Sequence, residues 1–311
     1  MHRKGSQPAD HSSWFAILSV SQFAAVAFAR KRLYLCVTNG AGQVELDLKN
    51  KVVVVTGAGR GVGAAVARSF CAEESKVVFV DRDPRGAAAL EGYEDRATFT
   101  QCDVSDLAQV SALFEQVQAR FGCLHVLVNN AAVNSGDYVS DIKEQDFQRI
   151  IDVNIRGYVY TTMRAVPVMR EAGYGRLIYI NSGSGLKASA GLSLYSASKY
   201  FDRGFAVAVA LETGRDNITA NSICPSDIYP EGGDPRTRAG SWTSESLLRV
   251  SLQKEGVSSL SELAAKRRQK NPMRRSCTVQ DVADLALFLA SKRAGFINGQ
   301  SIGVNGGSVP Y

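Results

Sequence analysis

The sequence predicts an α/β fold in which helices cover both faces of an open, doubly wound parallel sheet of about seven strands. From Lys51 onward, short runs of β-branched residues alternate with longer helical patterns. These runs are continuously apolar, as expected of strands that are buried on both faces of a sheet. A glycine-rich turn also joins the first strand to the first helix. The 311 residues, 45% of them hydrophobic, suffice for one large domain with a substantial core.

The expected elements follow one another in a regular βα order. Strands are expected at 52–55, 77–80, 96–102, 124–128, 177–180, 218–223 and 301–304. The main helices are expected at 61–74, 105–120, 144–171, 194–213 and 279–290. Between Pro225 and Thr278 no strand is expected, only a Gly/Pro-rich loop and two helices near 243–254 and 258–270. An insertion at the carboxyl end of a strand is placed to cover the ligand crevice, so residues of about 229–275 are interpreted as a lid.

Residues 1–45 differ from the rest and are interpreted as an extension of a single domain formed by residues 46–311. The stretch 14–29 is uncharged and mostly apolar, with basic residues on either side. It is shorter than the roughly 20 residues that span a bilayer, so no stable membrane span is expected. A poorly ordered leader, a signal peptide and a transit peptide remain open as interpretations. We expect a cytoplasmic protein unless one of the two targeting signals is present.

The composition argues against several functional classes. The six cysteines are scattered and include no CxxC, which argues against a zinc ribbon and a disulfide framework. His125 is the one histidine inside the predicted domain, so no metal site is expected, and we interpret this residue as structural. The net charge of +6 does not by itself indicate nucleic-acid binding. Residues 231–275 contain ten Lys/Arg against five Asp/Glu, so the lid holds most of this excess.

The first chemical motif is the turn TGAGRGVG at 56–63, between the first strand and the first helix. Glycines let the backbone approach a pyrophosphate, whose charge is then stabilised at the helix N-terminus. Strand, turn and helix occur in the order that a Rossmann-type dinucleotide site requires. The predicted cofactor contacts in this turn are Gly57, Gly59, Arg60, Gly61, Val62 and Gly63.

Asp81, at the end of the second strand, bears on the choice of nucleotide. A carboxylate there accepts hydrogen bonds from the adenosine ribose and repels a 2′-phosphate, which favours NAD. Arg60 and Arg82 favour NADP instead, because either side chain could bind the 2′-phosphate. At close range the repulsion between carboxylate and phosphate should outweigh a flexible surface arginine. NAD is therefore the expected cofactor, with NADP as the alternative.

The second motif is YSASK at 195–199. Residues four apart share one helix face, so the phenol of Tyr195 and the ammonium of Lys199 point into the same space. A nearby positive charge assists deprotonation of the phenol, as general acid–base catalysis requires. Ser182 follows the strand at 177–180, where its hydroxyl can hydrogen-bond the reacting oxygen. A plain helix surface could also produce the Tyr/Lys spacing, and Ser182 favours the catalytic interpretation.

Together these motifs resemble the short-chain dehydrogenase/reductase family over about residues 46–308. The motifs occur in the family's order and comprise 56–63, Asp81, CDV at 102–104, NNAA at 129–132, Asn154, Ser182, YSASK at 195–199 and NGG at 305–307. The resemblance implies a catalytic tetrad. In it, Asn154 holds a water of a proton relay, Ser182 orients the substrate, and Tyr195 is the acid/base. Lys199 assists Tyr195 and binds ribose.

The resemblance also implies cofactor contacts away from the glycine turn. Asp103 and Val104 would contact adenine, and the remaining contacts would be made by Asn130, Ala131, Pro225 and Ile228. Family members are commonly homotetramers, which is the expected assembly here. Three departures from the family pattern affect the nicotinamide side. They are Ala132 and Ser226, where glycine is usual, and Pro230, where threonine is common.

The substrate is the least defined part of the prediction. Arginine suits phosphate or carboxylate recognition, which makes Arg236 and Arg238 in the lid loop candidate substrate residues, together with Ser184. The segments 175–187 and 270–311 resemble sorbitol-6-phosphate 2-dehydrogenases more weakly than the whole chain resembles the family. We therefore expect a polyol or sugar(-phosphate) dehydrogenase. The alternatives are a 3-ketoacyl or general carbonyl reductase and, in another class, a non-catalytic NAD-sensing regulator.

Overall fold

A computed structural model describes residues 45–229 and 244–310, which belong to one compact unit. Three features of the sequence lie outside these residues. They are the N-terminal extension up to residue 44, the loop that contains Pro230, and the candidate substrate residues Arg236 and Arg238.

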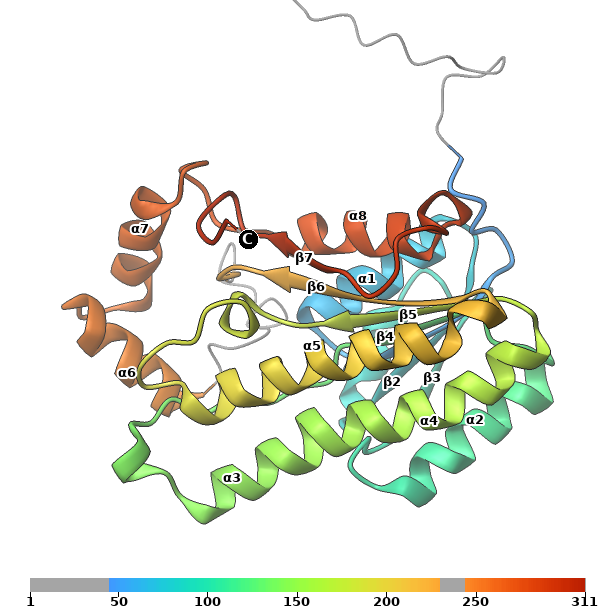
Figure 1. Cartoon of the computed structure of the whole chain (residues 1–311), viewed down its shortest axis with the longest axis horizontal. Helices are drawn as coiled ribbons and strands as arrows, with labels where there is room; N and C mark the ends of the chain where they lie inside the picture. Colours follow the sequence, from blue (N-terminus) through green and yellow to red (C-terminus); the bar gives the residue numbers. More distant parts are fainter. Residues whose placement is uncertain (1–44, 230–243, 311) are drawn as a thin grey trace, which may run out of the picture. The chain divides into compact units, whose positions relative to one another are not determined.

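Seven parallel strands form one sheet in the order β3-β2-β1-β4-β5-β6-β7 (Figure 1). Their bounds are β1 Val52–Thr56, β2 Lys76–Asp81, β3 Ala97–Gln101, β4 Val126–Asn129, β5 Gly175–Ile180, β6 Ile218–Pro225 and β7 Ser301–Val304. The order reverses between β1 and β4, so the crevice beyond the carboxyl ends of these strands is the expected ligand site. The predicted fold class, a Rossmann-type doubly wound sheet, is confirmed.

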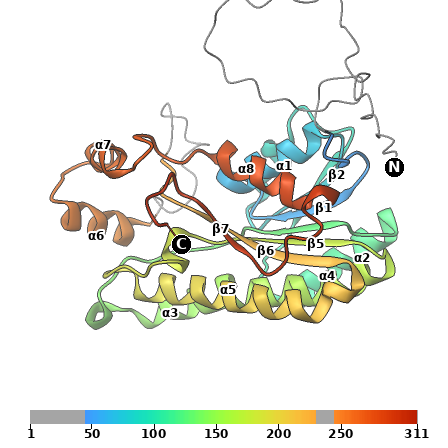
Figure 2. The same ribbon diagram turned by 45° about the horizontal axis from the view of Figure 1, so that its top comes forward.

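Helices cover both faces of this sheet. Their bounds are α1 Gly61–Ala72, α2 Leu107–Phe121, α3 Glu144–Ile150, α4 Gly157–Glu171, α5 Ser193–Thr213, α6 Glu245–Glu255, α7 Leu260–Lys270 and α8 Val279–Ala290. Short 3-10 helices occur at η2 Pro84–Leu90, η3 Val139–Asp141, η5 Gly183–Gly185, η6 Gly214–Asp216 and η8 Lys292–Ala294. Helices α1 and α8 pack on one face, and α2, α4 and α5 pack on the other (Figures 1 and 2).

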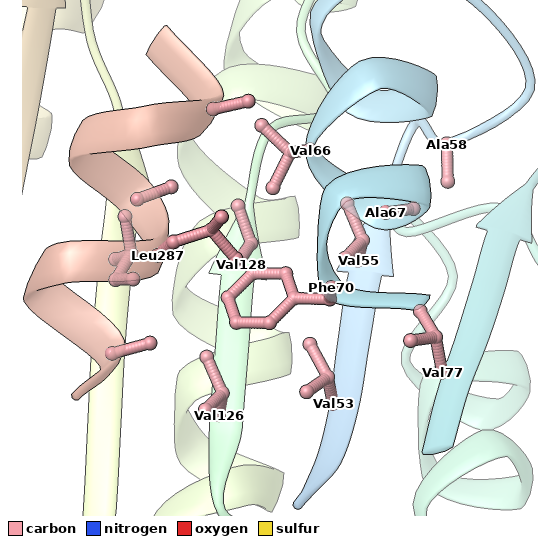
Figure 3. Close-up of a cluster of buried hydrophobic side chains, with 14 of the residues drawn as sticks. Val53, Val55, Ala58, Val66, Ala67, Phe70, Val77, Val126, Val128 and Leu287 are labelled. Carbon is pink, nitrogen blue, oxygen red and sulfur yellow. The ribbon is translucent and has the colours of Figure 1, made fainter. Parts of the chain in front are cut away.

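The first strand shows why the apolar runs are continuous. Val53 and Val55 of β1 point into the core beneath α1 and α8, where Phe70 fills the centre (Figure 3). Val52 and Val54 point the opposite way, into the core beneath α2, α4 and α5. Successive side chains of a strand alternate between faces, so a strand with a core on each side needs apolar residues at every position.

The helical pattern at 144–171, which was expected to be one helix, is interrupted in the structure. A π-helical segment, η4 Ile151–Arg156, separates α3 from α4 and contains the buried residue Asn154. A π turn inserts a residue without ending the helix, and such turns are frequent at functional sites. The apolar spacing continues on either side of the insertion, which explains why periodicity did not reveal it.

The insertion after β6 carries α6 and α7, which stand beyond the carboxyl ends of β5, β6 and β7 (Figures 1 and 2). A single parallel β-bridge between Ile228 and Cys277 joins the two ends of this insertion. No strand was expected between Pro225 and Thr278, and the bridge is an isolated pairing of two residues that lie outside the seven strands.

No helix within 45–229 or 244–310 is both long enough and apolar enough to cross a membrane.

Candidate active site

The glycine turn at 56–63 ends in a helix N-terminus whose amide groups are open. Gly57 and Gly61 have φ angles of +62° and +57°, a region that favours glycine. Arg60, the N-cap residue of α1, makes no side-chain cap hydrogen bond, and the first turn contains no acidic residue. The first N–H groups of a helix lack partners inside it, and they attract anions. The turn therefore fits the pyrophosphate of a dinucleotide.

Close packing fixes the shape of this turn. The side-chain amide of Asn130 donates to the carbonyl oxygens of Thr56 and Gly57, at 2.9 and 3.1 Å. A Cβ atom on Gly63 would lie 2.2 Å from the Gly57 oxygen, so only glycine fits there. The Ala131 amide donates to the Thr56 hydroxyl at 3.1 Å. Asn130 and Ala131 thus lie directly against the turn, as their predicted place near the cofactor requires.

Asp81 ends β2 beside the same turn. Its Oδ2 accepts a hydrogen bond from the Gly59 amide at 3.0 Å, and its Oδ1 accepts one from the Asp83 amide at 3.0 Å. The carboxylate is therefore held in a defined position at the edge of the turn. Arg60 and Arg82 are exposed on either side of it. The carboxylate that favours NAD and the two arginines that favour NADP are thus at the same end of the glycine turn.

The loop after β3 lies at the part of the crevice that is predicted to hold adenine. Asp103 accepts hydrogen bonds from the amide and the hydroxyl of Ser105, at 2.9 and 2.6 Å. Val104 is buried against α4, where a Cβ on Gly157 would lie 2.8 Å from its side chain. An open pocket at this edge is lined by Arg82, Asp83, Pro84, Gln101, Asp103 and Gln109. The structure therefore brings Asp103 close to Arg82.

The π-helical segment directs Asn154 toward two neighbouring elements. Its Oδ1 accepts from the Val133 amide at 2.8 Å, and its Nδ2 donates to the Val133 carbonyl at 2.9 Å. The same Nδ2 donates to the Ser198 hydroxyl at 3.0 Å, which in turn donates to the Tyr195 carbonyl at 2.8 Å. Asn154 thus ties the loop after β4 to the first turns of α5.

The two predicted catalytic hydroxyl groups belong to neighbouring parts of the chain, the N-cap of η5 and the first turn of α5. Ser182 is the residue before η5, immediately after β5, and its Oγ accepts a hydrogen bond from the Ser184 amide at 3.1 Å. Its hydroxyl hydrogen therefore remains available for another acceptor. Tyr195 is half-buried in the first turn of α5. Among the described residues, none forms a hydrogen bond with its hydroxyl group.

Lys199 lies one turn beyond Tyr195, with 1% of its surface exposed. Its Nζ is 5.9 Å from the centroid of the Tyr195 ring. The ammonium donates to the Ile180 carbonyl at 3.1 Å and to the Tyr158 hydroxyl at 3.3 Å. Burial raises the pKa of Tyr158 above its usual range, so this phenol stays neutral. The predicted pairing of Tyr195 and Lys199 on one helix face is therefore present.

The ends of β5 and β6 lie at the part of the crevice that is predicted to hold the nicotinamide. Pro225 ends β6, and its carbonyl oxygen lies 3.5 Å from where a Cβ of Gly183 would stand. Ser226 replaces the usual glycine, and its amide donates to the end of β7 at 3.0 Å. Ile228 is half-buried at the β-bridge. The methyl group at Ala132 is on an exposed residue, so this departure needs no rearrangement of the packing.

The lid is attached to the loop that follows β4. The Gly136 amide donates to the Ser246 hydroxyl at 3.1 Å, and Arg249 pairs with the largely buried Asp137 at 3.1 Å. A Cβ on Gly136 would lie 2.4 Å from the Cα of Leu247. The start of α6 therefore packs directly on the backbone of this loop.

The basic residues of α7 are largely paired inside the lid. Lys270, Arg267 and Lys266 converge on Glu255, at 2.7, 3.6 and 4.0 Å. Arg267 also pairs with Asp227 at 2.8 Å. The hydrogen bond from Lys270 is the main reason that the pKa of Glu255 lies below its usual value. These ion pairs connect α7 to α6 and to Asp227.

Two residues near the site were not singled out from the sequence. Asp202 lies one turn after Lys199 and pairs with it at 3.0 Å. Its position three residues from a catalytic candidate was the available signal, because such residues share a helix face. Gly136 carries the lid contact, and nothing in the local sequence indicates that contact, because its partner is 110 residues away.

Comparison with known proteins agrees with this geometry. A family model described as short chain dehydrogenase matches residues 51–238, and one described as enoyl-(acyl carrier protein) reductase matches 244–308. The chain is 33% identical to a 3-alpha-(or 20-beta)-hydroxysteroid dehydrogenase of Mycobacterium bovis, over 84% of this chain and 90% of that protein. It is 31% identical to galactitol 2-dehydrogenase of Agrobacterium fabrum, over 85% and 99%. The ligand-free aldohexose dehydrogenase of Thermoplasma acidophilum superposes with a TM-score of 0.72 at 30% identity, covering 85% and 96%.

Proposed function

Since the chain belongs to the short-chain dehydrogenase/reductase family, we propose that it is an NAD(P)-dependent oxidoreductase that interconverts a secondary alcohol and a ketone. One observation carries this proposal. The Tyr195 hydroxyl has no hydrogen bond to any described residue, and the buried ammonium of Lys199 lies 5.9 Å from the centroid of the Tyr195 ring. A phenol in this setting is free to exchange a proton with a substrate oxygen.

Each of the four predicted catalytic residues has its own role in proton transfer. Tyr195 takes the hydroxyl proton during oxidation and returns it during reduction. Ser182 donates its free hydroxyl hydrogen to the reacting oxygen, and Lys199 stabilises the phenolate electrostatically. Asn154 fixes the start of α5 through Ser198, which supports its predicted place in the proton relay. The nicotinamide, when bound, accepts or gives the hydride.

The cofactor is proposed to be NAD rather than NADP. Asp81 supports this choice, because two backbone amides fix its carboxylate at the edge of the glycine turn. A fixed carboxylate repels a 2′-phosphate more effectively than a flexible arginine attracts it. Fluorescence titration with NADH and NADPH tests the proposal, with Asp81→Ala as the variant. Wild-type preference for NADPH, or an unchanged preference in the variant, would contradict it.

The substrate is proposed to be a polyol or a sugar, phosphorylated or free. The galactitol and aldohexose dehydrogenases among the similar proteins support this class. The phosphate interpretation now depends on Arg236 and Arg238, because Arg267 and its basic neighbours in α7 pair inside the lid. The rival is a 3-ketoacyl or general carbonyl reductase, supported by the model that matches residues 244–308.

A spectrophotometric panel at 340 nm decides between these classes. Polyols, sugar phosphates, hydroxysteroids and β-keto thioesters are each assayed with both nicotinamide cofactors, for wild type and for Tyr195→Phe. We expect turnover of a polyol or sugar that is lost in the variant, while the variant still binds NADH. Retained activity in the variant would refute the assignment of Tyr195. Turnover of thioesters alone would refute the substrate class.

We also propose that the chain assembles as a homotetramer. The outer faces of α4 and α5 support this, because they expose large apolar side chains that a partner could cover. These residues are Met163, Tyr200, Phe201, Val207 and Leu211. Light scattering coupled to size exclusion measures the mass directly, and a monomer of 33.5 kDa would contradict the proposal.

A further inference from the structure

A buried ion pair lies directly behind the candidate acid/base. The Nζ of Lys199 is 3.0 Å from the Oδ2 of Asp202, and their side chains are 1% and 0% exposed. Both residues belong to α5, three positions apart. Of the ion pairs within 45–229 and 244–310, this one alone has both partners fully buried. Burying two charges is costly, so the placement calls for a reason beyond filling space.

Three hydrogen-bond acceptors surround the ammonium. They are the carboxylate of Asp202, the Ile180 carbonyl at 3.1 Å and the Tyr158 hydroxyl at 3.3 Å. The Tyr158 hydroxyl itself donates to the same Ile180 carbonyl at 2.9 Å. Two neutral acceptors and one carboxylate thus fix both the position and the charge of Lys199.

The carboxylate depends on Lys199 in return. Among the described residues, the Oδ1 of Asp202 has no hydrogen-bond partner, and its Oδ2 bonds to Lys199. The titratable groups that face the pair from the packed elements are Tyr158 on α4, Tyr179 on β5, Tyr195 on α5 and Cys224 on β6. Arg203, the next residue of α5, donates to the Gly185 carbonyl and the Ser301 hydroxyl. Lys199 forms the ion pair with Asp202, and its charge opposes the effect of burial on that carboxylate.

We propose that Asp202 is a positioning residue, the counter-ion that keeps Lys199 charged and fixed behind Tyr195. This inference rests on the proposed function, in which the Lys199 ammonium stabilises the phenolate. Asp202 does not touch the reacting atoms, and it acts through Lys199 alone. Because the carboxylate of Asp202 balances its charge, Lys199 can be buried in the active site and still remain protonated.

The direction of the effect follows from the surroundings of the pair. Burial alone would lower the pKa of Lys199, but Asp202 opposes it most strongly, and the net pKa is raised above the ordinary value. Burial raises the pKa of Asp202 to about 6, so above that pH both groups are charged. Without the carboxylate, burial prevails and the pKa of Lys199 falls. The variant should therefore lose its ammonium at alkaline pH, where the wild type keeps it.

The first experiment compares the pH dependence of kcat/KM in wild type and Asp202→Asn, from about pH 6 to about pH 10. Over this range we expect kcat/KM of the variant to fall about tenfold further than that of the wild type. The reason is that the charged fraction of Lys199 falls tenfold for each pH unit above its pKa. NADH affinity is followed over the same range, and it should weaken in parallel, because the family resemblance implies that Lys199 also contacts the ribose of the cofactor. The matched control is Asp216→Asn, which removes an exposed carboxylate paired with Arg170.

A purely structural role predicts a different result. In that case Asp202→Asn would lower activity and NADH affinity by the same factor at every pH. Such a result would overturn the proposal. The NADH measurement needs no substrate, so it reports on Lys199 even if the proposed reaction is wrong.

A stability cycle provides a second test should Asp202→Asn fold poorly. Denaturant unfolding is measured for Lys199→Met, Asp202→Leu and the double variant. Each single change leaves one buried charge without its partner and should cause a loss of stability, raising the equilibrium constant for unfolding by more than about tenfold. The double variant should recover most of this loss, because an apolar pair can replace a buried ion pair. Additive losses would refute the pairing, whatever the enzyme's substrate.

Discussion

The contact between Gly136 and the lid allows a sharp test of what the lid does. In Gly136→Ala, the new Cβ would lie 2.4 Å from the Cα of Leu247 and 2.8 Å from its amide nitrogen. Both are backbone atoms at the start of α6, so no side-chain rotation can relieve the overlap. Carbon atoms pack at roughly 3.5–4.0 Å, so α6 must move away by about 1 Å. That movement also strains the hydrogen bond to Ser246 and the ion pair of Asp137.

The magnitude follows from overpacking and from these two contacts. Forcing extra volume into a packed site typically costs about 1–3 kcal/mol, and a lost hydrogen bond falls within the same range. Taking about 2 kcal/mol as the loss of lid docking, kcat/KM should fall by about thirtyfold. The glycine turn lies on other elements, so the Kd for NADH should stay within about twofold of wild type.

Steady-state kinetics and NADH fluorescence titration measure these two quantities on the same preparations. The matched control is Gly204→Ala in α5, where a Cβ would meet no atom within 4 Å. A glycine inside a helix costs about 1 kcal/mol relative to alanine, so this control should stabilise the protein slightly. The reasoning fails if Gly136→Ala leaves kcat/KM unchanged, or if NADH affinity falls as far as kcat/KM does.

Three further predictions concern the cofactor turn, the lid and His125, which directly precedes the central strand β4. Gly63→Ala should abolish NADH binding in fluorescence titration, because its Cβ would lie 2.2 Å from the Gly57 oxygen; measurable affinity would contradict this. Glu255→Gln should speed amide hydrogen exchange in α6 and α7, since three cations lose their shared carboxylate, and an unchanged rate would count against a lid held by charge. Burial lowers the pKa of His125 to about 4, and its Nδ1 accepts from the Val52 amide. Between about pH 6.5 and 4 the unfolded chain binds a proton that the folded ring does not. The free energy of unfolding should therefore decrease as the pH is lowered through this range. Urea titrations should show that this decrease in unfolding free energy is about 1–2 kcal/mol smaller in His125→Asn than in wild type, allowing for solvent screening of a half-exposed ring. An identical decrease in both proteins would show that His125 does not cause it.

The strands and the cofactor turn could be predicted from the sequence because their determinants are local. The residues of β1 must be apolar at every position, since a core lies on each side of them. The turn at 56–63 needs glycine where φ is positive, as at Gly57, and where packing is closest, as at Gly63. Both requirements are visible in a single stretch of chain.

Features that depend on distant partners could not be predicted. The π turn at Asn154 leaves the apolar spacing on either side intact, and its purpose appears only when Val133 and Ser198 are placed beside it. The net charge of the lid could be counted from the sequence, but the convergence of three basic residues of α7 on Glu255 could not be predicted. Asp202 looked like an ordinary polar helix position, because its burial is set by α4 and β5 rather than by its own neighbours.

The single β-bridge between Ile228 and Cys277 has a consequence for how such an enzyme can change its substrate range. The bridge brings the two ends of the lid together beside the end of β6. The segment between them can therefore be exchanged with both splice points fixed by one backbone pairing, provided that the contact of α6 with the loop after β4 is kept. Grafting the corresponding segment of a relative between these two residues should transfer its selectivity while leaving the sheet and the proton-transfer residues in place. Modularity of this kind lets new specificities arise by recombination, without re-evolving the chemistry.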